Sequence, residues 1–417
     1  MAAPPSLPID AVRAPLLDSL EAGRRAVLVA PPGAGKTTRV PLMLRDRAWV
    51  ADRRILLLEP RRLAARAAAE RMAATLGEPV GETVGLRARF DTRVSDRTRI
   101  EVVTEGVFTR LIGQDPELGG IAAVIFDEFH ERSLDADLGL ALALDVQGAL
   151  RDDLRLLVMS ATLDGARVAA ILGDAPVIES QGRAFPVETR YLGRHAERDI
   201  AADVAAAVLQ ALGEEPGSII AFLPGQREIG RAAEQLAGRV AATTDVVPLY
   251  GAMDRAAQDR AVRPAAPGRN KVVLATSIAE TSLTIEGVRV VIDSGQTRVP
   301  RIEPDLGLTR LETVRVSRAA ADQRRGRAGR TEPGVCYRLW EEAGQGALQA
   351  FAKPEMLDAD LSGLMLDLAT WGVRDPAALR WLDPPPTAAV AAARTLLTEL
   401  GAVTPDGSVT PEGHAMA

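Results

Sequence analysis

The stretch AVLVAPPGAGKTT, residues 26–38, indicates the fold of this chain more strongly than any other segment. The apolar run at 26–30 predicts a buried strand, and the residues after it fit the pattern G/A-x-x-x-x-G-K-[S/T], which ends at Gly35, Lys36 and Thr37. A strand, a glycine-rich loop and a helix in this order bind phosphate, because backbone N–H groups and the positive helix end face the phosphate oxygens. In such a site Lys36 reaches the β- and γ-phosphates and the Thr37 hydroxyl is a ligand of Mg²⁺. The stretch therefore predicts an NTP site and does not by itself identify a reaction.

Short apolar runs alternate with alanine-rich helical stretches, a pattern that indicates a parallel α/β sheet. The runs of the first series lie at 26–30, 55–58, 100–103, 123–127 and 156–160. A second series follows QGRAFP, with runs at 218–223, 245–250, 271–276 and 288–293. We therefore expect two similar α/β units in tandem, with a β-hairpin inserted into the second between 294 and 318.

From Lys353 the pattern changes to helices, followed by AVTPDGSVTPEG with a tight turn at its PDG. Helices followed by a small hairpin predict a winged-helix module. We expect three domains, at 1–182, 183–352 and 353–417, and further domains that are missing beyond the C-terminus.

Composition narrows the classes of function. The 417 residues are 47% hydrophobic and 25% charged, as in an ordinary globular protein. The net charge of −6 means that any polyanion must be met by a local basic patch. The single Cys336 excludes a disulfide framework and a multi-cysteine metal site. The N-terminus lacks a signal-peptide pattern, and no run reaches the ~18 apolar residues of a membrane span, so we expect a cytoplasmic protein.

The segment DEFHERSLDADLGL, residues 127–140, directly follows the apolar run IAAVIF. An acid pair at the end of a strand is the second half of a phosphate-loop site. Asp127 would hold Mg²⁺ through its water shell, and Glu128, also a candidate metal residue, would orient or deprotonate the attacking water. A zinc H-E-x-x-H site starting at His130 would need a second histidine where Leu134 stands. A glycosidase-type acid pair would not accompany a phosphate loop.

The residues after this acid pair leave alternatives open. His130 is a candidate for direct chemistry, for a hydrogen-bonded coupler between the nucleotide and the second unit, or for a structural histidine. Asp135 and Asp137 are expected to start the next helix rather than to bind metal.

Eight motifs resemble, in order and spacing, those of the DEAH-box helicases of superfamily 2. They are PPGAGKTT, EPRRLAAR (59–66), TEG (104–106), DEFHER (127–132), SAT (160–162), FLPGQREI (222–229), ATSIAETSLTIEGV (275–288) and QRRGRAGR (323–330). Phe129 stands where that family usually has alanine and points to one bacterial branch. The resemblance implies two tandem RecA-like parallel-sheet domains that bind ATP, with other NTPs also accepted, and Mg²⁺ in the cleft between them.

The resemblance also implies roles for individual residues. The phosphate loop comprises Pro32, Gly33, Ala34, Gly35, Lys36, Thr37 and Thr38. Gln323 positions water and the γ-phosphate, and Arg327 and Arg330 are arginine fingers, which can contribute ~10³–10⁵ in rate. The residues that couple hydrolysis to movement are Ser160, Thr162 and Ser282. Arg71 and Val262 occupy the places that flank the base, and since Val262 is not aromatic, stacking is weak and promiscuous NTP use is expected.

A basic segment indicates where nucleic acid binds. Between Arg298 and Arg330, nine arginines against four acids give a local net charge of +5. The alternative is a basic face that serves only the NTP site. By resemblance, the residues that contact the nucleic-acid backbone are Arg61, Arg62, Arg89, Thr104, Gly225, Thr276, Arg298 and Arg301, and the hairpin at 298–315 separates strands.

Three functional hypotheses remain. The first is an NTP-driven helicase or translocase that moves 3′ to 5′ along single-stranded RNA. The second is an NTPase switch, stimulated by nucleic acid or a protein partner, without processive unwinding. The third is a DNA-directed motor. We expect a monomer without membrane contact that favours RNA over DNA and meets protein partners through the missing C-terminal domains.

Overall fold

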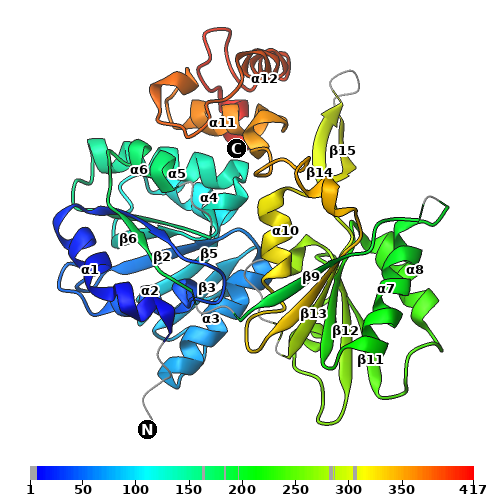
Figure 1. Ribbon diagram of the computed structural model, residues 1–417. Helices are drawn as coiled ribbons and strands as arrows, with labels where there is room; N and C mark the ends of the chain where they lie inside the picture. The colour runs from blue at the N-terminus through cyan, green and yellow to red at the C-terminus, as the bar shows by residue number, and fades with distance from the viewer. Residues whose placement is uncertain are drawn as a thin grey trace. The chain divides into compact units, whose positions relative to one another are not determined.

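The computed structural model describes residues 7–161, 165–182, 185–195, 197–280, 285, 287–303 and 308–417 (Figure 1). The chain splits into two compact units, each described by itself. The first unit comprises Met1–Gly182, Ile302–Thr309 and Lys353–Ala417, and the second comprises Arg183–Arg301 and Arg310–Ala352. No helix among the described residues is long and apolar enough to cross a membrane.

An eight-stranded sheet with the order β4-β3-β5-β2-β6-β7-β1-β8 forms the centre of the first unit. Its strands are β1 (Arg25–Val29), β2 (Arg54–Glu59), β3 (Val84–Ala88), β4 (Asp91–Arg93), β5 (Ile100–Thr104), β6 (Ile121–Phe126), β7 (Arg155–Ser160) and β8 (Val177–Glu179). The strands pair in parallel apart from β3 and β4, which form an antiparallel pair at the edge. All five apolar runs of the first series are strands, and the central ones are buried on both faces, as parallel strands between helices must be.

Helices cover both faces of this sheet. They are η1 (Pro8–Val12), α1 (Arg13–Ala22), α2 (Lys36–Arg45), α3 (Arg62–Leu76), α4 (Glu105–Gln114), the short turn η2 (Phe129–Glu131), α5 (Leu134–Ala149) and α6 (Gly165–Ile171). The helix α5 begins where the sequence predicts, with Asp135 and Asp137 in its first turn. Its N-cap is Ser133, whose hydroxyl accepts a hydrogen bond from the Ala136 N–H at 3.1 Å.

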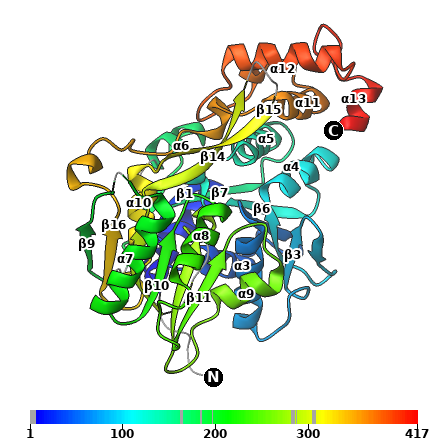
Figure 2. The same ribbon diagram turned by 90° about the vertical axis from the view of Figure 1, so that its right-hand side faces the viewer.

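Residues 353–417 pack on the first unit beside α4 and α5 (Figure 2). The elements of this segment are η5 (Glu355–Leu357), α11 (Ser362–Thr370), η6 (Pro376–Ala378), α12 (Thr387–Glu399) and α13 (Pro411–Met416). Phe108 and Leu138 share one hydrophobic cluster with Met356 and Leu364, so the segment and the sheet domain have a continuous core. This explains why α5 is apolar on nearly every side.

The small hairpin expected near the C-terminus is reduced in the structure. Its turn is present, because Thr404 and Ser408 are hydrogen-bonded and Gly407 has a φ of 86°. The two flanking segments, however, pair through one isolated antiparallel bridge, Val403 with Val409, and no longer ladder is found in this described segment.

The second unit is built on a six-stranded parallel sheet with the order β11-β12-β10-β13-β16-β9. Its strands are β9 (Val187–Tyr191), β10 (Ser218–Phe222), β11 (Thr244–Leu249), β12 (Asn270–Ala275), β13 (Val288–Asp293) and β16 (Gly334–Arg338). Its helices are α7 (Ile200–Glu214), α8 (Gln226–Leu236), α9 (Arg255–Val262), η3 (Ser277–Ala279), α10 (Arg318–Arg325) and η4 (Glu342–Gln345). The four runs of the second series are strands here, and the inserted hairpin is present as β14 (Gln296–Glu303) and β15 (Leu308–Arg315).

Candidate nucleotide and nucleic-acid sites

The phosphate loop lies between β1 and α2 in the conformation that its glycines permit. Gly33 and Gly35 have φ angles of 85° and 94°, in the left-handed region that other residues rarely adopt. A Cβ atom on Gly35 would also lie 2.6 Å from Cδ1 of Leu7. Gly35 is the N-cap of α2, so the first helical N–H groups, from Lys36 onward, face the loop as the sequence predicts.

Lys36, Asp127 and Glu128 form a buried cluster of charges at this loop. The Lys36 Nζ lies 3.0 Å from Oε1 of Glu128 and 3.8 Å from Oδ1 of Asp127. The Thr37 hydroxyl donates a hydrogen bond to the other Asp127 oxygen. Asp127 and Glu128 are 1% and 3% exposed, so the structure brings together the four residues that the two motifs predict.

The sheet order explains why two motifs 90 residues apart meet. The strands β6 and β1 both flank β7, and their carboxyl ends lie at the same edge. Asp127 follows β6, Ser160 ends β7, and the Ala30 N–H after β1 donates to the Ser160 carbonyl at 2.9 Å. A ligand site at the carboxyl edge of a parallel sheet is the general rule for this architecture.

Burial and pairing oppose each other in this cluster. Burial raises the pKa of Asp127 to about 6, and the Glu128 carboxylate adds to this effect, while Lys36 acts in the opposite direction. Burial alone would lower the pKa of Lys36, but Glu128 and Asp127 outweigh it and raise the pKa to about 12. Lys36 is therefore a cation at neutral pH, opposite two acids. The cluster has an excess of negative charge that a divalent cation would compensate.

His130 lies beside the acid pair and faces the end of β7. Its Nδ1 accepts a hydrogen bond from the Ala161 N–H at 3.2 Å and lies 3.5 Å from Oε2 of Glu128. Burial lowers the pKa of His130, so the imidazole is neutral at pH 7, consistent with its acceptor role toward Ala161. This geometry joins the acid pair to the SAT segment of the same unit, and a role for His130 as a coupler to the second unit stays a prediction. Thr162, the last residue of that segment, lies outside the described residues, as does Ser282.

The arginines of QRRGRAGR differ in their surroundings. Arg324 is fully buried and pairs with Glu280 at 2.5 Å and Asp293 at 2.7 Å. Arg325 donates to the Val187 carbonyl at 2.8 Å. Arg324 therefore does not add to the accessible charge of the basic segment 298–330, because its guanidinium is enclosed by two carboxylates of its own unit.

The three residues predicted to act on the nucleotide from this motif lie near the end of α10. Gln323 is partly exposed within the helix, and Arg330 is partly exposed beyond it. Arg327 is 5% exposed and donates from Nε to the Glu280 carbonyl at 2.8 Å. Arg330 is thus more exposed than Arg327.

In the first unit, predicted nucleic-acid residues follow neighbouring strands. Arg61 is the N-cap of α3 just after β2, and Thr104 ends β5, which pairs with β2 in the register Glu59 with Thr104. Arg62 and Arg89 are exposed, and the Arg89 guanidinium lies 4.9 Å from the ring centre of Phe90, itself 89% exposed. The structure thus places Arg61 and Thr104 on one edge of the sheet.

In the second unit, the corresponding edge carries Gly225 after β10 and Thr276 after the neighbouring strand β12. A Cβ atom on Gly225, the N-cap of α8, would lie 2.1 Å from Nη1 of Arg298, so the guanidinium lies directly over this glycine and would have to shift for a larger residue. Arg298 also pairs with Glu228 at 3.0 Å. Arg301 pairs with Glu312 across the hairpin at 2.7 Å, and both remain about half exposed.

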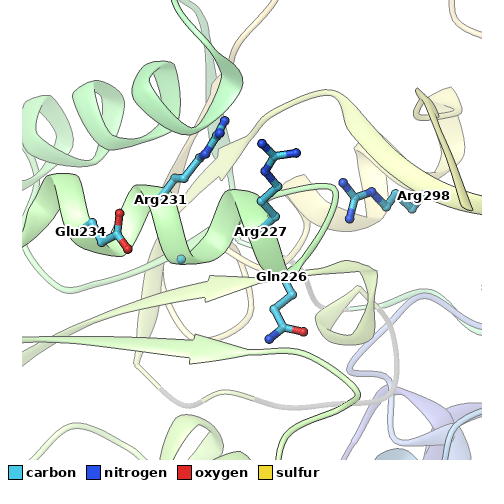
Figure 3. A pocket seen from close by; sticks show the side chains of 6 residues that line it. Gln226, Arg227, Arg231, Glu234 and Arg298 are labelled. Atoms are coloured by element: carbon cyan, nitrogen blue, oxygen red, sulfur yellow. The ribbon is translucent and has the colours of Figure 1, made fainter.

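An open groove lies beside Arg298 along α8 (Figure 3). Arg227 and Arg231 extend from α8 into this groove, which is also lined by Gln226 and Glu234. Arg231 pairs with Asp199 at 3.1 Å. The groove therefore offers arginines next to the predicted contact Gly225, although acids neutralise part of their charge.

The residues predicted to flank the base, Arg71 and Val262, belong to different units. Arg71 is exposed on α3, and Val262 is partly buried at the end of α9. Their pairing around a base stays a prediction.

Sequence reasoning assigned no role to several polar residues beside the acid pair. Glu131 pairs with Arg61 at 3.0 Å, and Glu105 accepts from the Ser133 hydroxyl at 2.5 Å. Arg132 pairs with Asp137 at 2.9 Å and with Asp383 at 2.7 Å. Three of these four acids are distant in sequence from their partners. Glu131 and Glu105 lie within the DEFHER and TEG motifs, which could have drawn attention to them, whereas no motif marks Asp383.

Comparisons with known proteins agree with this geometry. Residues 11–171 match the family model described as DEAD/DEAH box helicase, and residues 203–332 match the helicase conserved C-terminal domain. The chain is 52% identical over 414 residues to the ATP-dependent RNA helicase HrpB of Escherichia coli (strain K12), covering 99% of this chain and 51% of that protein. It is 37% identical over 422 residues to the pre-mRNA-splicing factor ATP-dependent RNA helicase prp22 of Schizosaccharomyces pombe (strain 972 / ATCC 24843), covering 99% and 36%.

Solved structures give the same result. The crystal structure of the Escherichia coli DEAH/RHA helicase HrpB superposes with a TM-score of 0.94 at 51% identity, covering 99% of this chain and 52% of that one. The chain thus spans about half the length of the bacterial relative it matches. Its two units are RecA-like domains with parallel sheets, as expected from the motifs. The chain belongs to the DEAD/DEAH box helicases, and within them to the HrpB type.

Proposed function

We propose that this chain is the motor portion of an ATP-dependent RNA helicase, which hydrolyses ATP with Mg²⁺ and moves 3′ to 5′ along single-stranded RNA. The observation that carries this proposal is the buried cluster of Lys36, Thr37, Asp127 and Glu128 at the phosphate loop. A lysine, a hydroxyl and two carboxylates in this arrangement are the set that phosphoryl transfer to water requires. The relatives named above are ATP-dependent RNA helicases, which supports ATP and RNA as ligands.

The donor set at the loop fits Mg²⁺. Magnesium in nucleotide sites is held by one or two carboxylates, waters and substrate phosphates rather than by a cage of protein ligands. Thr37 and Asp127, which already share a hydrogen bond, would hold the ion together with Glu128. When bound, the ion neutralises charge that develops on the phosphate oxygens.

The protein residues supply the remaining functions. The phosphate loop from Pro32 to Thr38 would hold the phosphates, with Lys36 neutralising the β- and γ-phosphate oxygens. Glu128 would orient the attacking water and accept its proton. The neutral His130, which accepts a hydrogen bond from Ala161, would keep the acid pair in a fixed position relative to that residue. Gln323, Arg327 and Arg330 would complete the site from the second domain, where a guanidinium offsets the charge of the transition state. Ser160, Thr162 and Ser282 would couple hydrolysis to domain movement.

Nucleic acid would run along the strand edges that carry Arg61, Arg62, Arg89 and Thr104 in one domain and Gly225, Thr276, Arg298 and Arg301 in the other. Hydroxyl groups, guanidinium groups and a helix N-terminus contact phosphates independently of sequence. This proposal includes a division into three domains, at 1–182, 183–352 and 353–417, of which the last is a winged-helix module. It also includes a cytoplasmic location, a monomeric state and protein partners bound through further C-terminal domains. Discrimination between bases by Arg71 and Val262 would be weak.

Two other functions remain as outcomes of one experiment. ATP hydrolysis is measured without polymer, with single-stranded RNA and with single-stranded DNA at equal nucleotide concentration. The proposal expects RNA to give the largest stimulation. Equal stimulation by DNA would favour a DNA-directed motor, and no stimulation by either polymer would contradict the translocase. Stimulation by RNA without displacement of a 3′-tailed duplex would identify an NTPase switch.

A further inference from the structure

The turn after the catalytic acid pair is short and fixed at both ends. Residues Phe129–Glu131 form the single 3₁₀ turn η2, and the Glu131 N–H donates to the Glu128 carbonyl at 2.8 Å. Glu128 and Arg132, on either side of the turn, have φ angles of 50° and 55°, in the left-handed region. Such residues cost roughly 1–3 kcal/mol each and persist because their surroundings hold them. A movement of Glu131 is therefore transmitted to Glu128 rather than absorbed between them.

The C-terminal side of the turn is anchored to other parts of the first unit. Arg132 is held by Asp137 and Asp383, and its carbonyl accepts from the Glu355 N–H at 3.1 Å. The Leu134 N–H donates to the Glu355 carboxylate at 2.9 Å. The C-terminal side of the turn is thus immobilised by residues 353–417.

The anchor at Glu131 differs, because solvent reaches it. Glu131 pairs with Arg61 at 3.0 Å, with 17% and 23% of the two side chains exposed. Arg132 and Asp137 are exposed by 10% and 3%. The guanidinium of Arg61 is therefore more open to an external anion than that of Arg132.

The same pair lies where the proposed nucleic-acid path meets the nucleotide site. Arg61 follows β2, whose neighbours in the sheet are β5, ending at Thr104, and β6, which leads to the acid pair. Arg61 and Glu131 also act with opposite sign on His130: Glu131 raises its pKa and Arg61 lowers it, beneath the larger effect of burial. Both charges of the pair therefore lie close enough to influence the histidine that joins the acid pair to Ala161.

A phosphodiester and the Glu131 carboxylate compete for one guanidinium. Arginine binds either oxyanion through the same N–H donors. A phosphate that accepts hydrogen bonds from the Arg61 guanidinium therefore weakens the ion pair between Arg61 and Glu131. Glu131 then loses this ion pair, and the short turn carries that change to Glu128 and His130.

We propose that Glu131 is a positioning residue that restrains ATP hydrolysis until a phosphate of single-stranded RNA replaces it as the partner of Arg61. This inference rests on the proposed function, since Arg61 must meet RNA. It adds a specific route by which RNA binding accelerates hydrolysis: RNA binds Arg61, and the loss of the Arg61 ion pair changes the position of Glu131.

The test compares Glu131→Gln and Arg61→Gln in the full chain. ATP hydrolysis is measured against the concentration of single-stranded RNA, and RNA affinity is measured separately by fluorescence anisotropy. Both variants remove the restraint, so the rate without RNA is expected to rise about three- to fivefold in each. RNA affinity is expected to move in opposite directions, tighter in Glu131→Gln because Arg61 is released and weaker in Arg61→Gln because the phosphate contact is lost.

A matched control is Glu21→Gln. Glu21 pairs with Arg47 through the same atoms and at the same 3.0 Å, on the surface of the same unit. Its rate, stimulation factor and RNA affinity are expected to equal those of the wild type. The double variant Arg61→Gln/Glu131→Gln should show no further rise in the RNA-free rate beyond either single variant.

Other outcomes separate the inference from the proposed function. If wild-type hydrolysis responds to RNA but Glu131→Gln keeps the wild-type RNA-free rate and RNA affinity, the inference is wrong and the proposed function stands. If the wild type neither binds RNA nor is stimulated by it, both fail. If Glu131→Gln lowers the melting temperature and reduces all rates equally, the variant Glu131→Asp, which keeps the charge, is measured as well. An RNA-free rate and a stimulation factor near those of the wild type in Glu131→Asp would support the restraint. An equal loss of rate in both variants would overturn it.

Discussion

The Lys36 Nζ lies 3.0 Å from Oε1 of Glu128, and the two side chains are 4% and 3% exposed. With Asp127 1% exposed beside them, the lysine is the cation that both acids share before any nucleotide binds. The phosphate loop therefore has a structural role in addition to its role in binding.

Lys36→Ala is expected to abolish ATP hydrolysis and to destabilise the first unit. Two buried carboxylates would lose their cation, and breaking a buried ion pair typically costs about 3–5 kcal/mol. The measurement is urea-induced unfolding at pH 7.5 together with the hydrolysis rate. Lys353→Ala is the control, because Lys353 is 50% exposed and pairs with Asp358 at the surface, where the expected loss is about 0–1 kcal/mol. Equal stability of the two variants would contradict this account.

Glu105 is expected to make stability fall as the pH rises. Burial raises the pKa of Glu105 from 4.5 to about 8, with Glu131, Asp135 and Glu355 adding to the effect and the Ser133 hydroxyl opposing it. An acid whose pKa is higher in the folded state than in the unfolded state contributes its full stabilisation below pH 4.5, and this contribution is lost as the pH rises toward 8.

Glu105→Gln is therefore expected to show a flatter dependence of melting temperature on pH between 5 and 9, with a higher value than wild type at pH 9. Burial also raises the pKa of Asp367 to about 6, so a residual slope remains and the difference between the two curves isolates Glu105. Glu117→Gln, at an exposed position, is the control. Parallel curves for Glu105→Gln and wild type would contradict this prediction, because they would show that ionisation of Glu105 does not destabilise the folded state.

The ion pair between Arg132 and Asp383 is expected to hold residues 353–417 on the first unit. Asp383→Asn leaves Arg132 paired with Asp137 but removes the charge that also pairs with Arg167 at 3.0 Å. Charge-assisted hydrogen bonds contribute about 1.5–3 kcal/mol each, so proteolysis within 353–417 should accelerate severalfold. The control Asp406→Asn affects a pair with Arg374 in which both side chains are 60% exposed, and cleavage there should be unchanged. Identical cleavage rates in both variants would exclude this anchor.

Arg330 and Arg324 are expected to respond differently to substitution. Arg330→Ala should reduce the turnover number by about 10³-fold or more, with ATP affinity and melting temperature nearly unchanged, because a finger acts on the transition state. Arg324→Ala should instead destabilise the second unit, since Glu280 and Asp293 would lose their buried partner. Steady-state kinetics and thermal unfolding of both variants distinguish the two roles. Unchanged turnover in Arg330→Ala would remove it as a finger.

Local patterns predicted much of the fold. The apolar runs became strands, and Gly33, Gly35 and Lys36 formed the expected loop, because these features depend on residues adjacent in sequence. The strands β4 (DTR) and β9 (VETRY) were missed because they are short or polar and become strands only by pairing at a sheet edge.

Contacts between distant segments could not be predicted in this way. Arg61 and Glu131 are 70 residues apart, and only the neighbouring positions of β2 and β6 bring them together. Within QRRGRAGR no local pattern separates the buried Arg324 from its more exposed neighbours. Burial of a charge depends on the acids that surround it, here Glu280 and Asp293.

The most direct test of the central claim, that this acid pair hydrolyses ATP, is Glu128→Gln. The variant keeps the size of the side chain and removes its ability to accept a proton from water. We expect ATP to bind with an affinity near that of the wild type, while single-turnover hydrolysis with RNA and Mg²⁺ falls by about 10²–10⁴-fold. Hydrolysis at the wild-type rate in this variant would contradict the account.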